Sequence, residues 1–354
     1  MSGENAGVGA RDPAKRFGEA KEPNCPPEKE KKQLANSPNS PAVAVEGLVK
    51  SYGPSPALRG VSFAVPRQGV FAYLGPNGAG KTTTINILCG LLCPDEGRVL
   101  VCGLDVEENP VAVKARIGVV PDESNLYPEL SCRRNLDYLG ELYGLPCKGR
   151  QKRVQELLDL FSLAERAQSP FRALSRGLKR RLVLAAALVH SPEVLFLDEP
   201  TLGLDVPSAR ALRGLIRRIN QAGATIFLTT HNLNEAEELA DTVCMLIKGR
   251  IAAVGTAAQV RRRVEGGTRL ILGLKGGLSA EDILTACPAV TEVQAQNGTW
   301  RLKIKDLPQA LAQAAALAGA RGLEITELRM DQPSLEEAFL SILDQDERET
   351  GDRK

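Results

Sequence analysis

A glycine-rich segment constrains the fold of this chain more than any other feature. Residues 75–82 read Gly-Pro-Asn-Gly-Ala-Gly-Lys-Thr, which fits the phosphate-binding pattern GxxxxGK[ST]. The apolar run 70–74 precedes this segment, and an apolar helical stretch begins near Thr82. Glycines let successive backbone N–H groups turn toward phosphate oxygens, and the positive end of the helix adds to the attraction. The segment therefore predicts a nucleotide phosphate site between a strand and a helix, without saying which class of nucleotide-binding protein this is.

The residue types within the segment predict individual contacts. The ammonium group of Lys81 is expected to reach the β- and γ-phosphates, and the Thr82 hydroxyl is expected to hold Mg²⁺. The expected nucleotide-binding residues of the segment are Gly75, Pro76, Asn77, Gly78, Ala79, Gly80, Lys81, Thr82 and Thr83.

A second element supplies two neighbouring acids. Residues 194–200 read Val-Leu-Phe-Leu-Asp-Glu-Pro, an apolar run that ends in Asp198 and Glu199. The run predicts a buried strand, and ligands of open α/β sheets collect at the carboxyl ends of such strands. Asp198 is expected to bind Mg²⁺, and Glu199 is expected to orient and deprotonate the attacking water.

The hydrophobic pattern divides the chain into four parts. Residues 1–40 are rich in Pro, Lys, Glu and Asn, and we expect them to be disordered; the basic stretch 29–32 could contact a membrane surface or simply be solvated. Strand-like runs and amphipathic segments alternate over 41–255, which predicts an α/β domain whose helical subdomain covers about 123–192. Residues 256–345 predict a small ferredoxin-like α+β domain of order β-α-β-β-α-β, closed by a helix at 334–343, and 346–354 is expected to be a disordered tail.

Composition excludes several classes of protein. Lys plus Arg number 45 and Asp plus Glu number 43, so the net charge of +2 gives no reason to expect a nucleic-acid partner. The sequence contains no apolar run long enough to cross a membrane and no apolar signal core, so we expect a cytoplasmic protein. The eight cysteines form no CxxC pair and are interpreted as small buried hydrophobic residues.

Several further motifs resemble those of the ABC ATPase family, from about residue 43 to 255. Residues 201–205 read TLGLD and resemble the D-loop that ends in Asp205, His231 follows the run LTT as the family's switch histidine does, and 174–178 read LSRGL at the place of the LSGGQ signature. The resemblance implies a P-loop NTPase fold with a helical insertion. It also implies that Tyr52 stacks on adenine and that His231 acts beside Glu199 on the γ-phosphate. Two such domains meet head to tail in the family, so the signature residues Ser175, Arg176 and Gly177 would face nucleotide held by a partner subunit.

Three positions depart from the family pattern. Asp122 replaces a glutamine that contacts Mg²⁺, so either Asp122 binds the ion through a water or Glu123 reaches it instead. Arg176 replaces the first signature glycine and either adds positive charge near the partner's phosphate or is solvated; Leu178 replaces the signature glutamine. Because Glu199, His231, Ser175 and Gly177 are all present, we expect hydrolysis to be retained.

The C-terminal segment suggests a branch within the family. Residues 333–340 read PSLEEAFL, which resembles the end of a small C-terminal domain attached to ATPases of type-two exporters. The resemblance implies a subunit that binds and hydrolyses ATP with Mg²⁺ and powers a separate multi-span permease. It would act as a homodimer or heterodimer, without nucleic acid, on the cytoplasmic face of the membrane. The alternatives are a catalytically weak regulatory subunit and an ABC ATPase outside transport.

Overall fold

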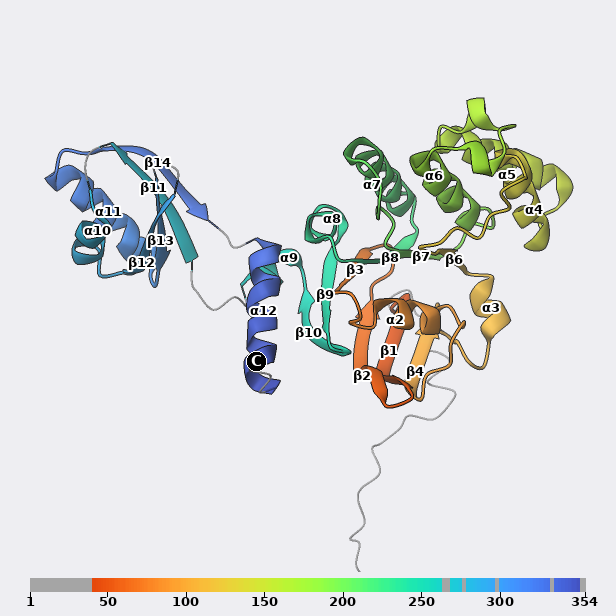
Figure 1. Cartoon of the computed structure of the whole chain (residues 1–354), viewed down its shortest axis with the longest axis horizontal. Helices are drawn as coiled ribbons and strands as arrows, with labels where there is room; N and C mark the ends of the chain where they lie inside the picture. The colour runs from red at the N-terminus through yellow and green to blue at the C-terminus, as the bar shows by residue number, and fades with distance from the viewer. Residues whose placement is uncertain (1–39, 263–267, 276–277, 297–298, 332–333, 351–354) are drawn as a thin grey trace, which may run out of the picture. The chain divides into compact units, whose positions relative to one another are not determined.

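The computed structural model describes residues 40–262, 268–275, 278–296, 299–331 and 334–350 (Figure 1). The tail expected at 1–40 therefore lies almost wholly outside the described residues, as does the end of the tail expected at 346–354.

A six-stranded sheet forms the centre of the larger α/β unit. Its order is β10-β9-β3-β8-β7-β6, and all neighbouring strands are parallel except the edge pair β10 and β9. The bounds are β3 (Val70–Leu74), β6 (Ile117–Val120), β7 (Val194–Asp198), β8 (Thr225–Thr230), β9 (Thr242–Ile247) and β10 (Arg250–Gly255). Every residue of β3, β7 and β8 is buried, including the threonines of β8 and Asp198 at the end of β7.

A second, antiparallel sheet covers one face of the first sheet, and the sequence did not predict it as a separate layer. Its order is β2-β1-β4-β5, with bounds β1 (Val43–Tyr52), β2 (Ser55–Val65), β4 (Glu96–Val101) and β5 (Leu104–Asp105). The helices α2 (Lys81–Leu88) and α3 (Pro110–Lys114) belong to the same side. Between the sheets the rings of Phe63, Phe71 and Phe227 stack with centroids 5.4–5.9 Å apart.

Helices cover the opposite face of the central sheet (Figure 1). The predicted helical insertion forms α4 (Cys132–Leu142) and α5 (Cys147–Leu160), followed by the short 3₁₀ turns η1 (Ala164–Arg166) and η2 (Phe171–Ala173). The next helices are α6 (Arg176–Ala187), α7 (Val206–Gln221), α8 (Leu233–Leu239) and α9 (Ala257–Arg261). Ser131 caps α4 by accepting a hydrogen bond from the backbone N–H of Arg134.

The small C-terminal unit has the predicted ferredoxin-like connectivity. Its elements are β11 (Thr268–Lys275), α10 (Ala280–Ala286), β12 (Val290–Gln296), β13 (Thr299–Ile304), α11 (Leu307–Ala320) and β14 (Glu324–Asp331). The sheet order is β12-β13-β11-β14 with antiparallel pairing throughout, which confirms the β-α-β-β-α-β expectation. Leu270, Leu272 and Leu302 pack with residues of α10 and α11 in a core separate from those of the larger unit.

The last helix, α12 (Leu335–Thr350), differs from its prediction in length and in packing. It continues to Thr350, where the sequence predicted a helix end at 343 and a disordered tail from 346. Ser334 caps it, because its hydroxyl oxygen accepts from the N–H of Glu337 at 3.1 Å. The apolar face formed by Leu335, Ala338 and Ile342 belongs to the core of the larger unit, where α12 contacts α8 and α9. A segment predicted as the end of the small domain therefore completes the core of the larger unit.

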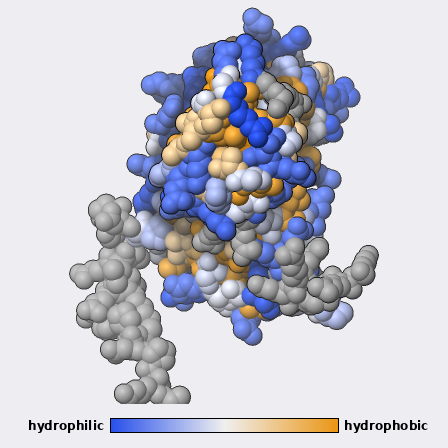
Figure 2. Space-filling model, turned by 90° about the vertical axis from the view of Figure 1, so that its left-hand side faces the viewer, coloured by the Kyte–Doolittle hydropathy of each residue, from blue (hydrophilic) through white to orange (hydrophobic). Residues whose placement is uncertain are grey.

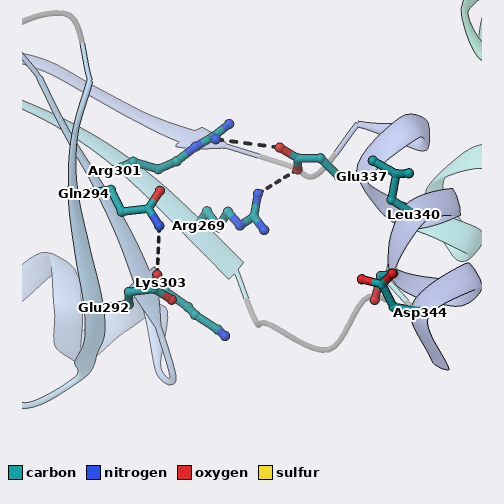
Figure 3. A pocket seen from close by; sticks show the side chains of 9 residues that line it. Arg269, Glu292, Gln294, Arg301, Lys303, Glu337, Leu340 and Asp344 are labelled. Atoms are coloured by element: carbon teal, nitrogen blue, oxygen red, sulfur yellow. Dashed lines mark hydrogen bonds and ion pairs between the residues drawn. The ribbon is translucent and has the colours of Figure 1, made fainter. Parts of the chain in front are cut away.

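Ion pairs also connect α12 to the small sheet. The carboxylate of Glu337 lies 2.6 Å from Nη1 of Arg269 and 3.6 Å from Nη1 of Arg301, as Figure 3 shows. These groups line a cavity of about 410 Å³ whose other charged groups include Lys303, Glu292 and Asp344. The cavity carries both signs of charge in close proximity.

The face of the molecule shown in Figure 2 is mostly hydrophilic, with apolar side chains between the polar ones. None of the described helices is long and apolar enough to span a bilayer.

Five of the described cysteines are buried, but Cys93 and Cys147 are exposed, so the interpretation of the cysteines as buried hydrophobic residues was wrong for these two.

The packing of α12 predicts a measurable effect on stability. Leu335→Ala should lower the free energy of unfolding of the larger unit by about 3 kcal/mol, because it removes a fully buried side chain from that core. Leu340→Ala on the same helix is the control, since Leu340 is 54% exposed. Chemical denaturation followed by circular dichroism compares the two variants. Equal effects would contradict the packing described for α12.

Candidate nucleotide-binding site

The carboxyl ends of three neighbouring strands assemble the site. β8 pairs in parallel with β3 on one side and with β7 on the other. The glycine-rich segment follows β3, Glu199 follows β7 and His231 follows β8. Residues separated by more than a hundred positions in the sequence therefore meet at one edge of the sheet, as ligand sites of open α/β sheets do.

Glycines are required at two positions of the segment by close backbone approach. A Cβ atom on Gly75 would lie 2.4 Å from the carbonyl oxygen of Leu246, and one on Gly80 would lie 2.7 Å from that of Ala57. Gly80 also has a φ of 109°, a conformation that side-chain-bearing residues rarely adopt, and it is the residue from which α2 begins. At these two positions the loop lies so close to neighbouring backbone that a side chain would not fit without a shift.

Lys81 is buried at the start of α2 and is held in place by the loop itself. Its Nζ donates hydrogen bonds to the carbonyl oxygens of Gly75 at 2.8 Å and Pro76 at 3.3 Å. The same Nζ lies 3.5 Å from Oε1 of Glu199. The ammonium group is thus aimed across the mouth of the loop toward the acid that follows β7.

Glu199 joins Lys81 to His231. Its second carboxylate oxygen, Oε2, lies 2.9 Å from Nδ1 of His231 and 3.4 Å from the backbone N of His231. Glu199 has a φ of 44°, and its N–H is bonded to the carbonyl oxygen of Thr229 at 3.1 Å. A positive φ in a residue other than glycine costs about 1 kcal/mol or more, so the surrounding structure holds Glu199 in this conformation.

The oxygen atoms at this edge are of the kind that Mg²⁺ prefers. Oδ1 of Asp198 accepts a hydrogen bond from the Thr229 hydroxyl at 2.5 Å, which orients the carboxylate at the end of β7. Thr82, one residue into α2, exposes its hydroxyl group. A carboxylate, a hydroxyl and phosphate oxygens form a hard oxygen donor set, which fits Mg²⁺.

A cleft of about 560 Å³ contains most of the predicted site. It is lined by Tyr52, Ala57, Asn77, Gly78, Gly80, Lys81, Thr82, Thr83, Asp122, Glu199, Leu202 and His231. Tyr52 is 52% exposed, so part of its side chain is available for contact. Sequence reasoning missed Ala57, which belongs to no phosphate-binding motif, and did not single out Leu202 within the run TLGLD.

The predicted signature residues and Asp205 of the D-loop lie outside the lining of this cleft. Ser175 caps α6 through the N–H of Leu178, and Asp205 caps α7 through the N–H of Ser208. Nη1 of Arg176 donates to the carbonyl oxygen of Gly203 at 2.9 Å. Arg176 is therefore not simply solvated: it connects the start of the signature helix to the D-loop of its own chain.

Arg180 organises the site and was also missed. It lies on α6, one turn after the signature, and its guanidinium donates hydrogen bonds of 2.5–3.1 Å to five backbone carbonyl oxygens. These oxygens belong to Pro121, Asp122, Asp198, Glu199 and Pro200. Burial lowers the pKa of Arg180, and the carboxylates of Asp122 and Asp198 oppose that shift. A single side chain thus holds the segment that follows β6 against the segment that follows β7.

The role of Arg180 can be tested by removing its donors. Arg180→Met should lower the free energy of unfolding by about 3 kcal/mol, because several partly buried carbonyl groups lose a charged donor. Arg181→Met is the matched control, since it leaves the Arg180 guanidinium in place. Chemical denaturation measures both variants. A difference within the error of the measurement would contradict the organising role.

Comparisons with known proteins show the family to which the chain belongs. Residues 58–202 match the family described as ABC transporter, and 255–343 match the ATP-binding protein DrrA1-3-like C-terminal domain. The daunorubicin resistance ATP-binding protein DrrA3 of Streptomyces coeruleorubidus is 38% identical over 87% of this chain and 97% of its own length. The linearmycin resistance ATP-binding protein LnrL of Bacillus subtilis is 34% identical over 84% of this chain and 96% of its own.

Solved structures show the same fold for the larger unit. An ATP-binding subunit of an ABC transporter superposes with a TM-score of 0.58 at 32% identity, over 63% of this chain and 92% of that one. An ATP-binding cassette solved as a dimer with ADP and phosphate superposes with a TM-score of 0.56 at 25% identity, over 60% of this chain and 98% of that one. The chain has the phosphate loop and the cleft described above, and it matches two relatives along nearly their whole length. It belongs to the ATP-binding proteins of the ABC transporter family.

Proposed function

We propose that this chain hydrolyses ATP with Mg²⁺ and thereby powers export through a separate multi-span permease. The observation that carries the proposal is the position of Glu199, which is held between Lys81 and His231 at the cleft beside the phosphate loop. A carboxylate in that place has the chemistry to accept a proton from water at the terminal phosphate. The two full-length relatives are named for resistance to daunorubicin and to linearmycin, which supports export as the purpose of the hydrolysis.

The loop and its flanking residues would bind the nucleotide. Backbone N–H groups of residues 75–80 and the N-terminus of α2 favour negative charge, and Lys81 would donate to the β- and γ-phosphate oxygens. Tyr52, which lines the same cleft with an exposed ring, would stack on adenine. Thr82 and Asp198 would hold Mg²⁺, and the ion would neutralise charge on the phosphates; Asp122 lines the same cleft as Thr82.

Glu199 and His231 would carry the hydrolytic step. Nδ1 of His231 lies within hydrogen-bond distance of Glu199, so that the ring keeps the carboxylate in place. The other ring nitrogen, Nε2, would then contact an oxygen of the γ-phosphate. Glu199 would orient a water for in-line attack and accept its proton, while Lys81 stabilises the charge that develops on the phosphate oxygens.

A second subunit, identical or related, would complete the site. Ser175 and Gly177 stand at the start of α6, whose N-terminal N–H groups are suited to bind a phosphate on a facing subunit. The Arg176 contact to Gly203 would hold this surface to the D-loop, which ends at Asp205. Loss of the γ-phosphate would weaken the contact between subunits, and reopening would move the permease. The chain would then lie on the cytoplasmic face of the membrane, attached through that permease.

Glu199→Gln tests the hydrolytic step. We expect turnover to fall about a hundredfold or more, because the amide cannot accept the proton of water, while ATP binding is retained. ATP turnover with the permease present and ATP affinity of the isolated chain are the two measurements. Wild type as inactive as Glu199→Gln in the presence of the permease would favour the catalytically weak regulatory subunit instead.

Lys81→Met tests the phosphate site independently of hydrolysis. This variant should lose ATP affinity by about tenfold or more, because the buried ammonium group directed across the loop is removed. Lys179→Met is the control, since Lys179 lies over the ring of Phe171 and outside the lining of the cleft. Fluorescent nucleotide titration measures both affinities, and equal values would contradict the assignment of Lys81.

A further inference from the structure

A buried carboxyl group lies next to the catalytic edge and has no role in the mechanism above. Glu235 occupies the first turn of α8, four residues after His231, and is only 1% exposed. Neither of its carboxyl oxygens makes a hydrogen bond of ordinary geometry within the described part of the chain, although the hydroxyl groups of Thr201 and Thr230 lie close enough to influence it. A buried polar group without a partner is costly, so its retention calls for a physical reason.

Other groups make the hydrogen bonds that a glutamate in the first turn of a helix usually makes with the helix N-terminus. The side-chain oxygen of Asn232 caps α8, and the N–H of Asn232 donates to the Thr230 hydroxyl at 3.0 Å. In α9 and α10, by contrast, the equivalent third residue of the helix, Gln259 or Asp282, accepts the hydrogen bond from the N-cap N–H. Glu235 is therefore not needed to complete a capping box.

The nearby arginine is also paired elsewhere. Nε of Arg213, on α7, lies 2.6 Å from Oε2 of Glu238, an exposed neighbour of Glu235 on α8. Glu237 pairs with Arg261 of α9. Glu235 is thus the acid of this helix that is directed into the protein without a counter-ion of its own.

Opposing influences act on the pKa of the Glu235 carboxyl group, and burial is the largest of them. Burial raises its pKa, and the Glu199 carboxylate acts in the same direction. The hydroxyl groups of Thr230 and Thr201 and the charge of Arg213 lower it but do not outweigh burial.

The two threonines connect Glu235 to the proposed chemistry. Thr201 comes two residues after Glu199, at the start of the D-loop, and Thr230 comes one residue before His231. We propose that Glu235 is a positioning residue, whose buried carboxyl group links the segment of Thr201 to the segment of Thr230 and so keeps His231 in register with Glu199. The proposal rests on the hydrolysis proposed above, in which these two residues act together.

Substitutions that separate shape from hydrogen bonding test this role. Glu235→Gln keeps the shape and an N–H donor, and its kcat should stay within about threefold of wild type. Glu235→Leu fills the same space without a polar group, and its kcat should fall about tenfold while the KM for ATP changes by less than about threefold. Glu238→Gln, on the exposed side of the same helix, is the matched control and should leave kcat unchanged. Wild-type turnover by Glu235→Leu, or equal losses in both Glu235 variants, would overturn the proposal.

A second measurement does not depend on hydrolysis. The chain contains two histidines, so isotope labelling of histidine yields two imidazole signals by NMR. In Glu235→Leu the signal of His231 should shift, whereas in Glu235→Gln it should stay close to its wild-type position. His190, which stacks on Tyr143 at 3.7 Å, is the internal control in both variants. An unmoved His231 signal in Glu235→Leu overturns the positioning role, while a wild type without ATP turnover but with the expected shifts would overturn the proposed hydrolysis alone.

Discussion

The parallel pairing of β3, β8 and β7 determines where this protein can place its chemistry. These three strands are buried on both faces, between the antiparallel sheet on one side and the helical layer on the other. Their registers bring Leu74 beside Thr230 and Asp198 beside Thr229, so the segments that follow them emerge at one level. The phosphate loop, Glu199 and His231 are neighbours because their strands are neighbours. Hydrophobic burial of the strands therefore fixes the geometry of polar groups that contribute little to that burial.

Hydrogen bonds to backbone carbonyls then give this edge its final shape. Arg180 gathers the segments after β6 and β7, and Lys81 closes its own loop through the carbonyls of Gly75 and Pro76. Glu199 adopts a positive φ within this framework. An unfavourable backbone conformation of this kind persists only where surrounding contacts outweigh its cost, and it directs the carboxylate to Lys81 and His231. The surroundings of Glu235 are consistent with the same design, in which buried polar groups orient the reacting ones.

The C-terminal region contributes to two hydrophobic cores, one in the small unit and one in the larger unit. The small sheet and its two helices form their own core, while α12 completes the core of the larger unit through Leu335, Ala338 and Ile342. Glu337, on the same helix, pairs with Arg269 and Arg301 of the small sheet. One helix thus contacts the larger unit through its apolar side chains and the small unit through a charged one. The same helix also contacts α8, the helix that follows His231.

Local spacing in the sequence was sufficient to predict the phosphate loop, the acids after β7 and the ferredoxin-like order of the small unit. In each of these cases the signal consists of residues close together in the chain: glycines that a tight loop requires, an apolar run that ends in acids, and alternation with period two or 3.6. The resemblance to a known family added Tyr52, Asp122 and His231, which the structure places at the same cleft. The sequence by itself therefore determined the kind of site and most of its residues.

Tertiary structure decided the remaining features, because they depend on contacts between distant segments. The pairing of β1, β2, β4 and β5 into a separate sheet, the packing of α12 in the larger core and the contact of Arg176 with Gly203 leave no periodic pattern in the sequence. Arg180 reads as one of several basic residues after the signature, and Glu235 reads as one of three acids on a short helix. These two side chains are removed from water only when the chain folds. In water their donors and acceptors are satisfied by solvent, whereas in the folded protein their interactions depend on which groups lie nearby.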